Sequence, residues 1–288
     1  MKWIDPGYAL TSPPLSFPRL ERMWRRSRHT AILLLLSAPL LLFLTAPLLA
    51  LIVRAAPADL LAKLFDPAVA QAVWLSMTTT TTTLLLALTF GMPVAYLLAR
   101  RQFRGRAVLD TLIDLPIVMP PSVAGIALLL AFGRRGLLGQ HFSAAGVDIA
   151  FTQVAVVMAQ VFVAAPFFVK AATAGFSNID REIEAAAAID GASSFQIFRM
   201  VTMPLAGAAL LAGAVMTWAR ALGEFGATII FAGNFPGRTQ TMPLAIYLGF
   251  EMELNRALTL AAILLVASFG VLFVVKVLLR QRLQTWER

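Results

Sequence analysis

Long stretches without charged residues alternate with short polar segments along the 288 residues of the chain. A helix needs about 20 apolar residues to cross the hydrocarbon core of a bilayer, so each stretch is a candidate membrane span. The pattern predicts an all-α integral membrane protein with six transmembrane helices. The predicted spans cover residues 31–53, 67–99, 115–133, 149–169, 205–232 and 257–275.

Prolines or polar residues mark three of these spans. The third begins with Pro116, Pro120 and Pro121, which lack backbone donors and predict a broken entry before the helix proper. Pro166 interrupts the fourth. The second carries an unbroken run of threonines at 78–83, whose hydroxyls can bond to the carbonyl one turn back and so survive in lipid.

Composition supports a membrane protein and excludes other classes. The chain is 59% hydrophobic and 14% charged, with a mean hydropathy of +0.79, which is too apolar for a soluble domain of this size. The absence of cysteine excludes disulfides and thiolate metal sites. The net charge of +9 does not indicate a nucleic-acid partner, because the basic residues lie at the ends of the apolar runs. We therefore expect the chain to be embedded in the lipid bilayer.

Residues 1–30 differ from the rest of the chain. Four prolines interrupt them and five arginines follow, which predicts a loosely ordered, basic cytoplasmic tail before a membrane domain at 31–288. A signal peptide is the alternative, with 55–58 as its cleavage region. A signal peptide has an apolar core of only about 7–15 residues, whereas residues 31–53 are uncharged over 23 positions. A first spanning helix is therefore favoured.

Positive charges predict the orientation in the membrane. With the N-terminus inside, 16 lysines and arginines fall on the cytoplasmic side and 6 on the outer side, while Lys170 and Arg220 lie within helices. Cytoplasmic segments carry such an excess of positive charge. Both termini and the segment 177–204 are therefore expected to face the cytoplasm.

The segment 177–204 reads as two short helices joined by a turn. Ser177 and Asp180 are typical helix-start residues, and Gly191 can end the first helix by adopting a left-handed backbone. The second helix carries two phenylalanines, and Pro204 is expected to end the unit. Exposed alanines and two exposed aromatics would suit a groove on another protein.

The spacing in this segment resembles the EAA loop of ATP-binding-cassette (ABC) importer permeases. Its Gly, branched apolar and Pro positions match, whereas Ala185 occupies the pattern's glutamate position and Glu184 lies one residue earlier. The resemblance implies a loop that couples the chain to a cytoplasmic ATPase; the alternative is an ordinary linker. The implied coupling residues are Glu184, Ala185, Ala186, Gly191, Phe195, Phe198 and Pro204.

The chain has no recognisable energy source of its own. A phosphate-binding loop needs Gly-x-x-x-x-Gly-Lys-Ser/Thr, and none of the lysines has that setting. The resemblance implies that a partner ATPase binds ATP and Mg. His29 and His141 are predicted in loops on opposite sides of the membrane and cannot share a metal. We therefore expect no catalytic residue, metal site or cofactor in this chain.

Arg220 and Glu224 lie four residues apart in the fifth predicted span, so they can pair along one helix. A charge at mid-membrane costs about 2.5–3.5 kcal/mol on insertion scales, so the pair requires an explanation. It is either a structural ion pair or part of a translocation path on which Arg220 meets an anion. The threonine run likewise forms a helix contact or lines that path. The candidate path residues are Thr78, Thr79, Thr82, Arg220, Glu224 and Thr228.

Three further stretches indicate which group of ABC importer permeases the chain resembles. Residues 218–228, Trp-Ala-Arg-Ala-Leu-Gly-Glu-Phe-Gly-Ala-Thr, resemble the fifth-helix signature shared by molybdate and sulfate permeases. Residues 119–133 and 233–247 are similar to the molybdate branch. Glycines and a proline at 233–237 predict a turn. Arg238, Thr239 and Gln240 after it would offer donors to an oxyanion or to a docking protein, unless the loop is merely solvated.

The resemblance implies a type I ABC importer permease in a bacterial inner membrane. Two copies would form the pore as a homodimer, two cytoplasmic ATPase subunits would grip the two loops, and an extracytoplasmic oxyanion-binding protein would deliver molybdate and also tungstate. The alternatives are a sulfate or thiosulfate permease and, from another class, an ion-coupled secondary transporter. An intramembrane hydrolase is disfavoured because no catalytic set is recognisable.

Overall fold

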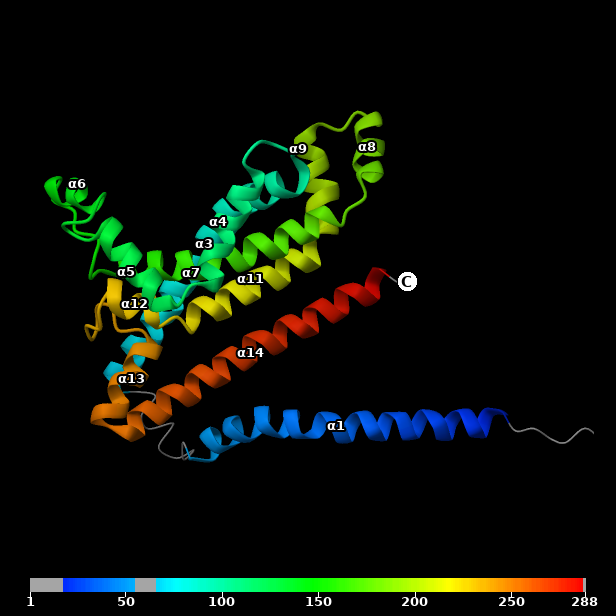
Figure 1. The fold of residues 1–288 in the computed structure, drawn as a ribbon, viewed down its shortest axis with the longest axis horizontal. Coiled ribbons are helices and arrows are strands. Elements are labelled where there is room, and N and C mark those ends of the chain that lie inside the picture. Colours follow the sequence, from blue (N-terminus) through cyan, green and yellow to red (C-terminus); the bar gives the residue numbers. More distant parts are fainter. Residues whose placement is uncertain (1–17, 55–65, 287–288) are drawn as a thin grey trace, which may run out of the picture. The chain divides into compact units, whose positions relative to one another are not determined.

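The computed structural model describes residues 18–54 and 66–286, and the chain divides into two compact units, residues 1–50 and 51–288 (Figure 1). Helix α1 (Pro18–Arg54) accounts for the described part of the first unit. The predicted loose tail is wrong from residue 18 onward, because this stretch is helical and continuous with the candidate span Leu33–Arg54. Residues 1–17 of that tail lie outside the described residues.

The second unit is also helical throughout its described residues. Its elements, in chain order, are α3 (Pro67–Arg100), α4 (Arg106–Val118), α5 (Pro121–Phe132), α6 (Gly139–Ala144), α7 (Gln153–Ser177), α8 (Arg181–Ile189), α9 (Ser194–Ile197), the π-helix η1 (Phe198–Thr202), α10 (Met203–Leu205), α11 (Gly207–Leu222), α12 (Gly226–Phe231), α13 (Met242–Met252) and α14 (Leu254–Trp286). The all-α prediction is confirmed.

Four helices in the described part of the chain are long and apolar enough to cross a membrane alone. Two bent pairs of helices raise the number to six if each pair counts as one span. In the first pair, the chain bends by 117° between α4 and α5. The break falls at Met119 and Pro120, where the prolines predict it, because Pro120 has no N–H with which to continue α4.

The fifth predicted span is not one helix. The chain bends by 71° between the segments Ser194–Leu205 and Gly207–Leu222, and α11 then ends at Leu222. Residues 223–225 separate α11 from the short helix α12. The prediction of a continuous helix over 205–232 is therefore wrong. Arg220 belongs to α11, whereas Glu224 lies in the break after it.

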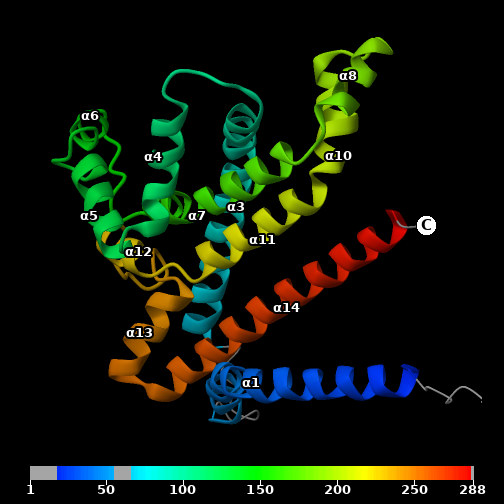
Figure 2. The same cartoon turned by 45° about the vertical axis from the view of Figure 1, so that its right-hand side comes forward.

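Helices α3, α7 and α11 lie side by side and form the centre of the second unit (Figures 1 and 2). Small residues allow this close approach: a Cβ built on Gly175 of α7 would lie 2.6 Å from the Cβ of Ala209 in α11. Gly213 faces Ala171 in the same way, at 2.7 Å. Close contact through small residues is the usual means of association between membrane helices, where burial from lipid gives little driving force.

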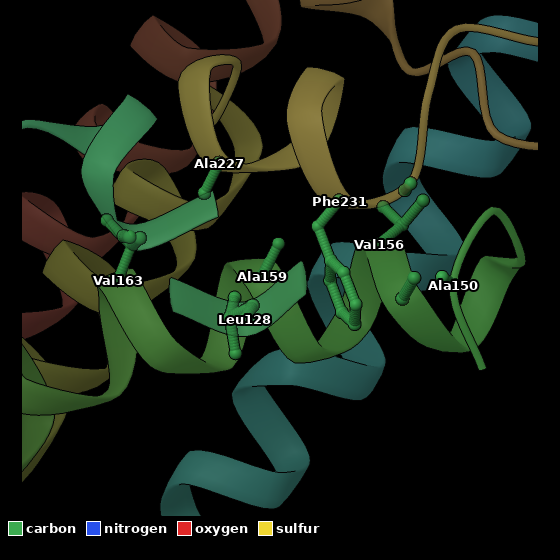
Figure 3. Packing of buried hydrophobic residues seen from close by; sticks show 10 residues of the cluster. Leu128, Ala150, Val156, Ala159, Val163, Ala227 and Phe231 are labelled. Carbon is green, nitrogen blue, oxygen red and sulfur yellow. The ribbon is translucent and has the colours of Figure 1, made fainter. Parts of the chain in front are cut away.

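A second cluster holds the broken segments in place. The short helix α12 packs against α5 and α7, with Ala227 and Phe231 buried among Leu128, Val156 and Ala159 (Figure 3). A Cβ at position 125 of α5 would lie 2.8 Å from the carbonyl oxygen of Ala227, so only glycine fits at this crossing. Both breaks in the predicted spans are thus packed against each other within one core.

Candidate functional site

The segment 177–204 forms a compact helical hairpin at one end of the second unit (Figure 2). Asp180 caps α8 by accepting a hydrogen bond from the backbone N–H of Glu182 at 2.9 Å. Gly191 has a φ of 89°, the left-handed conformation that stops α8. The predicted helix start at Ser177 is wrong, because Ser177 is the last residue of α7 and the new helix begins at Arg181.

The second half of the hairpin differs more from the prediction. Ser193 and Gln196 form a reciprocal capping box that starts α9, and the chain then continues through the π-helix η1. Pro204 does not end the unit. It lies in the first turn of α10, where a missing N–H costs little, and the bend follows at Ala206.

A buried ion pair fastens the hairpin to the membrane helices. Arg100, the last residue of α3, donates from Nη2 to Oε1 of Glu184 at 2.9 Å and from Nη1 to the carbonyl oxygen of Ile179 at 3.2 Å. Thr202 of η1 donates to the same carboxylate oxygen at 2.6 Å. The side chains of Arg100 and Glu184 are only 8% and 18% exposed. The carboxylate of Glu184 therefore ties α8, η1 and α3 together.

Aromatic packing makes a second attachment. The ring of Phe198 in η1 lies 5.2 Å from that of Tyr96 in α3 and 6.1 Å from that of Phe176 in α7. The prediction of two exposed aromatics is therefore wrong for Phe198, which is half-buried, whereas Phe195 is 69% exposed. The helical period allows either orientation, and the packing against α3 and α7 is not visible in the local sequence.

Several apolar side chains are exposed on the hairpin, alongside exposed charged residues such as Arg181 and Glu182. Ile189 is 86% exposed, Met200 and Ile183 are also exposed, and Ala185 and Ala186 leave the surface of α8 flat between them. Exposed large apolar residues gathered on a short polar hairpin are typical of a protein-docking surface. We call these five apolar residues together with Phe195 the docking face.

Glu224 bridges the break between α11 and α12. Its Oε1 accepts a hydrogen bond from the backbone N–H of Ala227 at 2.8 Å, and its Oε2 lies 2.7 Å from Nη1 of Arg220. The side chain of Glu224 is 1% exposed and that of Arg220 is 29% exposed. Of the two roles left open by the sequence, this geometry favours a structural pair for Glu224, because one of its oxygens holds the start of α12 and the other pairs with Arg220 of α11.

The remaining candidate path residues differ in exposure. Thr79 and Thr228 are buried within this chain, and Thr79 donates to the carbonyl oxygen of Leu75 at 2.8 Å. Thr82 is exposed and donates to the carbonyl oxygen of Thr78 at 2.8 Å. These are the one-turn hydrogen bonds expected of threonines in a membrane helix. Their role in a path stays a prediction.

The loop between α12 and α13 buries two of the three side chains that were predicted to offer donors. The backbone N–H of Phe235 donates to Oγ1 of Thr239 at 3.1 Å, and Nε2 of Gln240 donates to Oδ1 of Asn234 at 2.9 Å. Thr239 and Gln240 are buried, and Arg238 is exposed. Of these three side chains, only Arg238 therefore offers donors to another molecule.

Several pairings were not predicted, among them Arg100 with Glu184, Lys170 with Asp110 and Asp114, and Arg256 with Asp66. The third lies at the start of α3, where Arg256 of α14 donates to the capping residue Asp66 at 2.6 Å. This hydrogen bond, helped by that from the N–H of Ala68, lowers the pKa of Asp66. The signal available for Asp110 and Asp114 was their spacing of four residues before a proline, which places both on one helix face.

Comparison with known proteins places the chain in a family. The family model described as "Binding-protein-dependent transport system inner membrane component" matches residues 72–284. The molybdenum transport system permease protein ModB of Mycobacterium tuberculosis is 43% identical over 204 residues, 70% of this chain and 76% of that protein. The molybdate/tungstate transport system permease protein WtpB of Thermococcus kodakarensis is 36% identical over 224 residues, 77% of this chain and 84% of that protein.

The fold is also found in a solved transporter. A chain of the crystal structure of a bacterial ABC transporter involved in the import of the acidic polysaccharide alginate superposes with a TM-score of 0.70 at 16% identity, covering 91% of this chain and 99% of that one. The chain therefore belongs to the inner-membrane components of binding-protein-dependent transport systems: it is the multi-pass permease of an ABC importer, not its catalytic subunit.

Proposed function

We propose that this chain is the permease of an ATP-driven importer of molybdate and tungstate. The observation that carries the proposal is the exposed docking face on a hairpin that Glu184 and Phe198 fix to α3 and α7. An ATPase bound to this face could transmit its movement to the transmembrane helices through these contacts. The printed names of relatives 36% and 43% identical to this chain support the oxyanion as substrate.

The proposed importer also implies the partners of this chain. Two copies of the chain form the pore, and each presents its docking face to one of two cytoplasmic ATPase subunits, which bind ATP and Mg. An extracytoplasmic binding protein delivers the oxyanion near Arg238. Both termini lie in the cytoplasm, an orientation that the distribution of lysines and arginines favours.

The contacts described above provide a path for mechanical coupling. When the ATPase subunits close on ATP, they move the two hairpins. Arg100 and Tyr96 carry that displacement into α3, and Phe176 carries it into α7. Packed helices respond to such displacements by rigid shifts and not by continuous deformation. The pore then alternates between openings to the two sides of the membrane.

Reconstitution tests the function directly. The permease is placed in proteoliposomes with its ATPase and binding protein, and uptake of labelled molybdate is measured with ATP inside the compartment that holds the ATPase. We expect uptake that excess tungstate abolishes and that an equal excess of sulfate leaves within twofold. Competition by sulfate as strong as that by tungstate would instead identify a sulfate permease.

A further inference from the structure

The loop between α3 and α4 carries positive charge that the chain does not neutralise. Arg101 and Arg104 are exposed, and no acidic residue occurs in the sequence between Asp66 and Asp110. Within the part of the chain that the structure describes, neither guanidinium has a hydrogen-bonding or ionic partner. Asp110, the next carboxylate along the chain, is already bonded to Lys170. The loop therefore presents two cations that are free to bind an anion from outside the chain.

Exposed apolar side chains of α3 lead up to this loop. Phe90 and Leu97 are exposed and lie seven residues apart, which places them on one side of the helix. Arg101 follows Leu97 by one turn, and its backbone N–H donates to the carbonyl oxygen of Leu97 at 3.0 Å. The helical register therefore holds up to Arg101, and its side chain continues the exposed apolar side of α3.

Helix α4 has an exposed apolar side as well. Val108, Leu112 and Leu115 recur at helical spacing and are all exposed. Arg106, the first residue of α4, is half-buried and lies two residues before Val108, about 200° around the helix. Arg106 therefore points away from the apolar side, and it offers a matched control for the two arginines of the loop.

The loop lies where a membrane span ends. Helix α3 is a candidate span over Pro67–Arg100, so Arg101 and Arg104 come directly after its apolar part. Positively charged side chains at such ends extend to the level of the lipid headgroups. Arg100 bonds to Glu184 of the hairpin, so the loop is at the end of the unit that carries the docking face. In the orientation of the proposed function, on which this inference rests, that end meets the cytoplasmic leaflet, whose surface is negatively charged.

We propose that Arg101 and Arg104 bind the phosphate of an anionic phospholipid in the cytoplasmic leaflet. Guanidinium groups bind phosphate oxygens through two parallel hydrogen bonds. The exposed ring of Phe103, between the two arginines in sequence, offers an apolar contact to the upper part of the lipid. The bound lipid holds the end of α3 at a fixed depth, and this is the helix end to which Glu184 attaches the hairpin.

Quenching by brominated lipids tests the site. The chain has no cysteine, so Gln102→Cys introduces a single exposed thiol into the loop, which is labelled with a fluorophore. The full-length permease in a non-ionic detergent is titrated with phosphatidylglycerol or with phosphatidylcholine, both brominated near the headgroup end of the acyl chains. Each arginine at an anionic surface contributes about fivefold in affinity, so phosphatidylglycerol should quench at a concentration about 25-fold lower than phosphatidylcholine.

Matched variants of the labelled permease separate this site from a general effect of charge. Arg101→Gln combined with Arg104→Gln should bring the two lipids within twofold of each other, whereas Arg101→Lys combined with Arg104→Lys should keep most of the preference. Arg106→Gln removes a charge of the same kind from the other side of α4 and should leave the preference within twofold. An equal response to both lipids before these changes, or an equal loss in Arg106→Gln, would refute the site.

Three results would assign the loop to another occupant and overturn the proposal. Absence of quenching by either lipid would show that protein covers the loop, as a second copy of the chain could. Loss of quenching on addition of the ATPase would assign the arginines to that subunit. Displacement of phosphatidylglycerol by inorganic phosphate or molybdate at matched ionic strength would indicate a site for a free oxyanion. Absence of molybdate uptake by the assembled transporter, with the lipid preference intact, would count against the proposed function alone.

Discussion

Removing the carboxylate of Glu184 should loosen the hairpin without touching the docking face. In Glu184→Ala, the guanidinium of Arg100 loses its partner at 2.9 Å and the hydroxyl of Thr202 loses its partner at 2.6 Å. Hydrogen bonds to charged groups contribute about 1.5–3 kcal/mol each. Because Glu184 is 18% exposed, water can replace part of the lost hydrogen bonding. We therefore expect the substitution to destabilise the attached conformation of the hairpin by about 3 kcal/mol.

That cost limits the effect on ATPase binding. The apparent affinity for the ATPase is the intrinsic affinity multiplied by the fraction of permease molecules whose hairpin has the binding conformation. A free-energy cost of about 1.4 kcal/mol to that conformation can lower the apparent affinity tenfold. A loss of about 3 kcal/mol therefore weakens binding of the ATPase by up to roughly 100-fold. Titration of the ATPase onto immobilised permease in detergent measures this value. Glu184→Gln, which keeps an acceptor at Oε1, should lose much less.

A matched control and a double-mutant cycle separate this explanation from a general charge effect. Glu182→Gln removes an exposed carboxylate two residues earlier on the same helix that no hydrogen bond links to Arg100 or Thr202, so it should leave the thermal stability of the permease unchanged. Arg100→Met combined with Glu184→Ala should be less damaging than the sum of the two single changes, with a coupling energy of about 1–3 kcal/mol. Additive effects within about 0.5 kcal/mol would refute the idea that this pair fixes the hairpin.

Three further outcomes follow from the described contacts. Phe195→Asp should abolish ATPase binding while the permease keeps its thermal stability, and unchanged binding would exclude this residue from the docking face. Arg220→Ala strands the buried carboxylate of Glu224 and should destabilise the permease by about 3 kcal/mol in thermal unfolding, whereas loss of uptake at unchanged stability would assign Arg220 to the path. Asp66→Asn removes the charge facing Arg256 and should cost up to about 1 kcal/mol at pH 7. Because folding lowers the pKa of Asp66 from 3.8, that stabilisation is present above pH 3.8 and disappears as the pH falls below it, so the two unfolding temperatures should converge there.

Local chemistry in the sequence accounts for the features that were predicted correctly. Pro120 and Pro121 broke the third span where expected, because two successive residues lack a backbone donor. The interruption predicted at Pro166 is wrong, because this single proline lies within the continuous helix α7, as Pro116 lies within α4. The left-handed backbone at Gly191 follows from the same kind of local rule. The break after Leu222 was missed because the intervening residues are too few to interrupt an apolar window. At this break the backbone N–H of Ala227 donates to Glu224, a contact that hydropathy does not detect.

Contacts between distant residues could not be predicted from the chain. Arg100 appeared to be only a charge that ends an apolar run, yet it pairs with Glu184, 84 residues later. The inward orientation of Phe198 depends on Tyr96 and Phe176, which lie on two other helices. Both cases require the packing of α3 against α7, which is fixed by small residues and not by the residues that it brings together.

The central claim is that this chain is a conduit powered through the hairpin at 177–204. The most direct test is accumulation of labelled molybdate in proteoliposomes that contain the permease and binding protein, with and without the ATPase. The account predicts accumulation against a gradient only when the ATPase and ATP are present, and its loss in the Phe195→Asp variant. Uphill accumulation by the permease without any ATPase would contradict it.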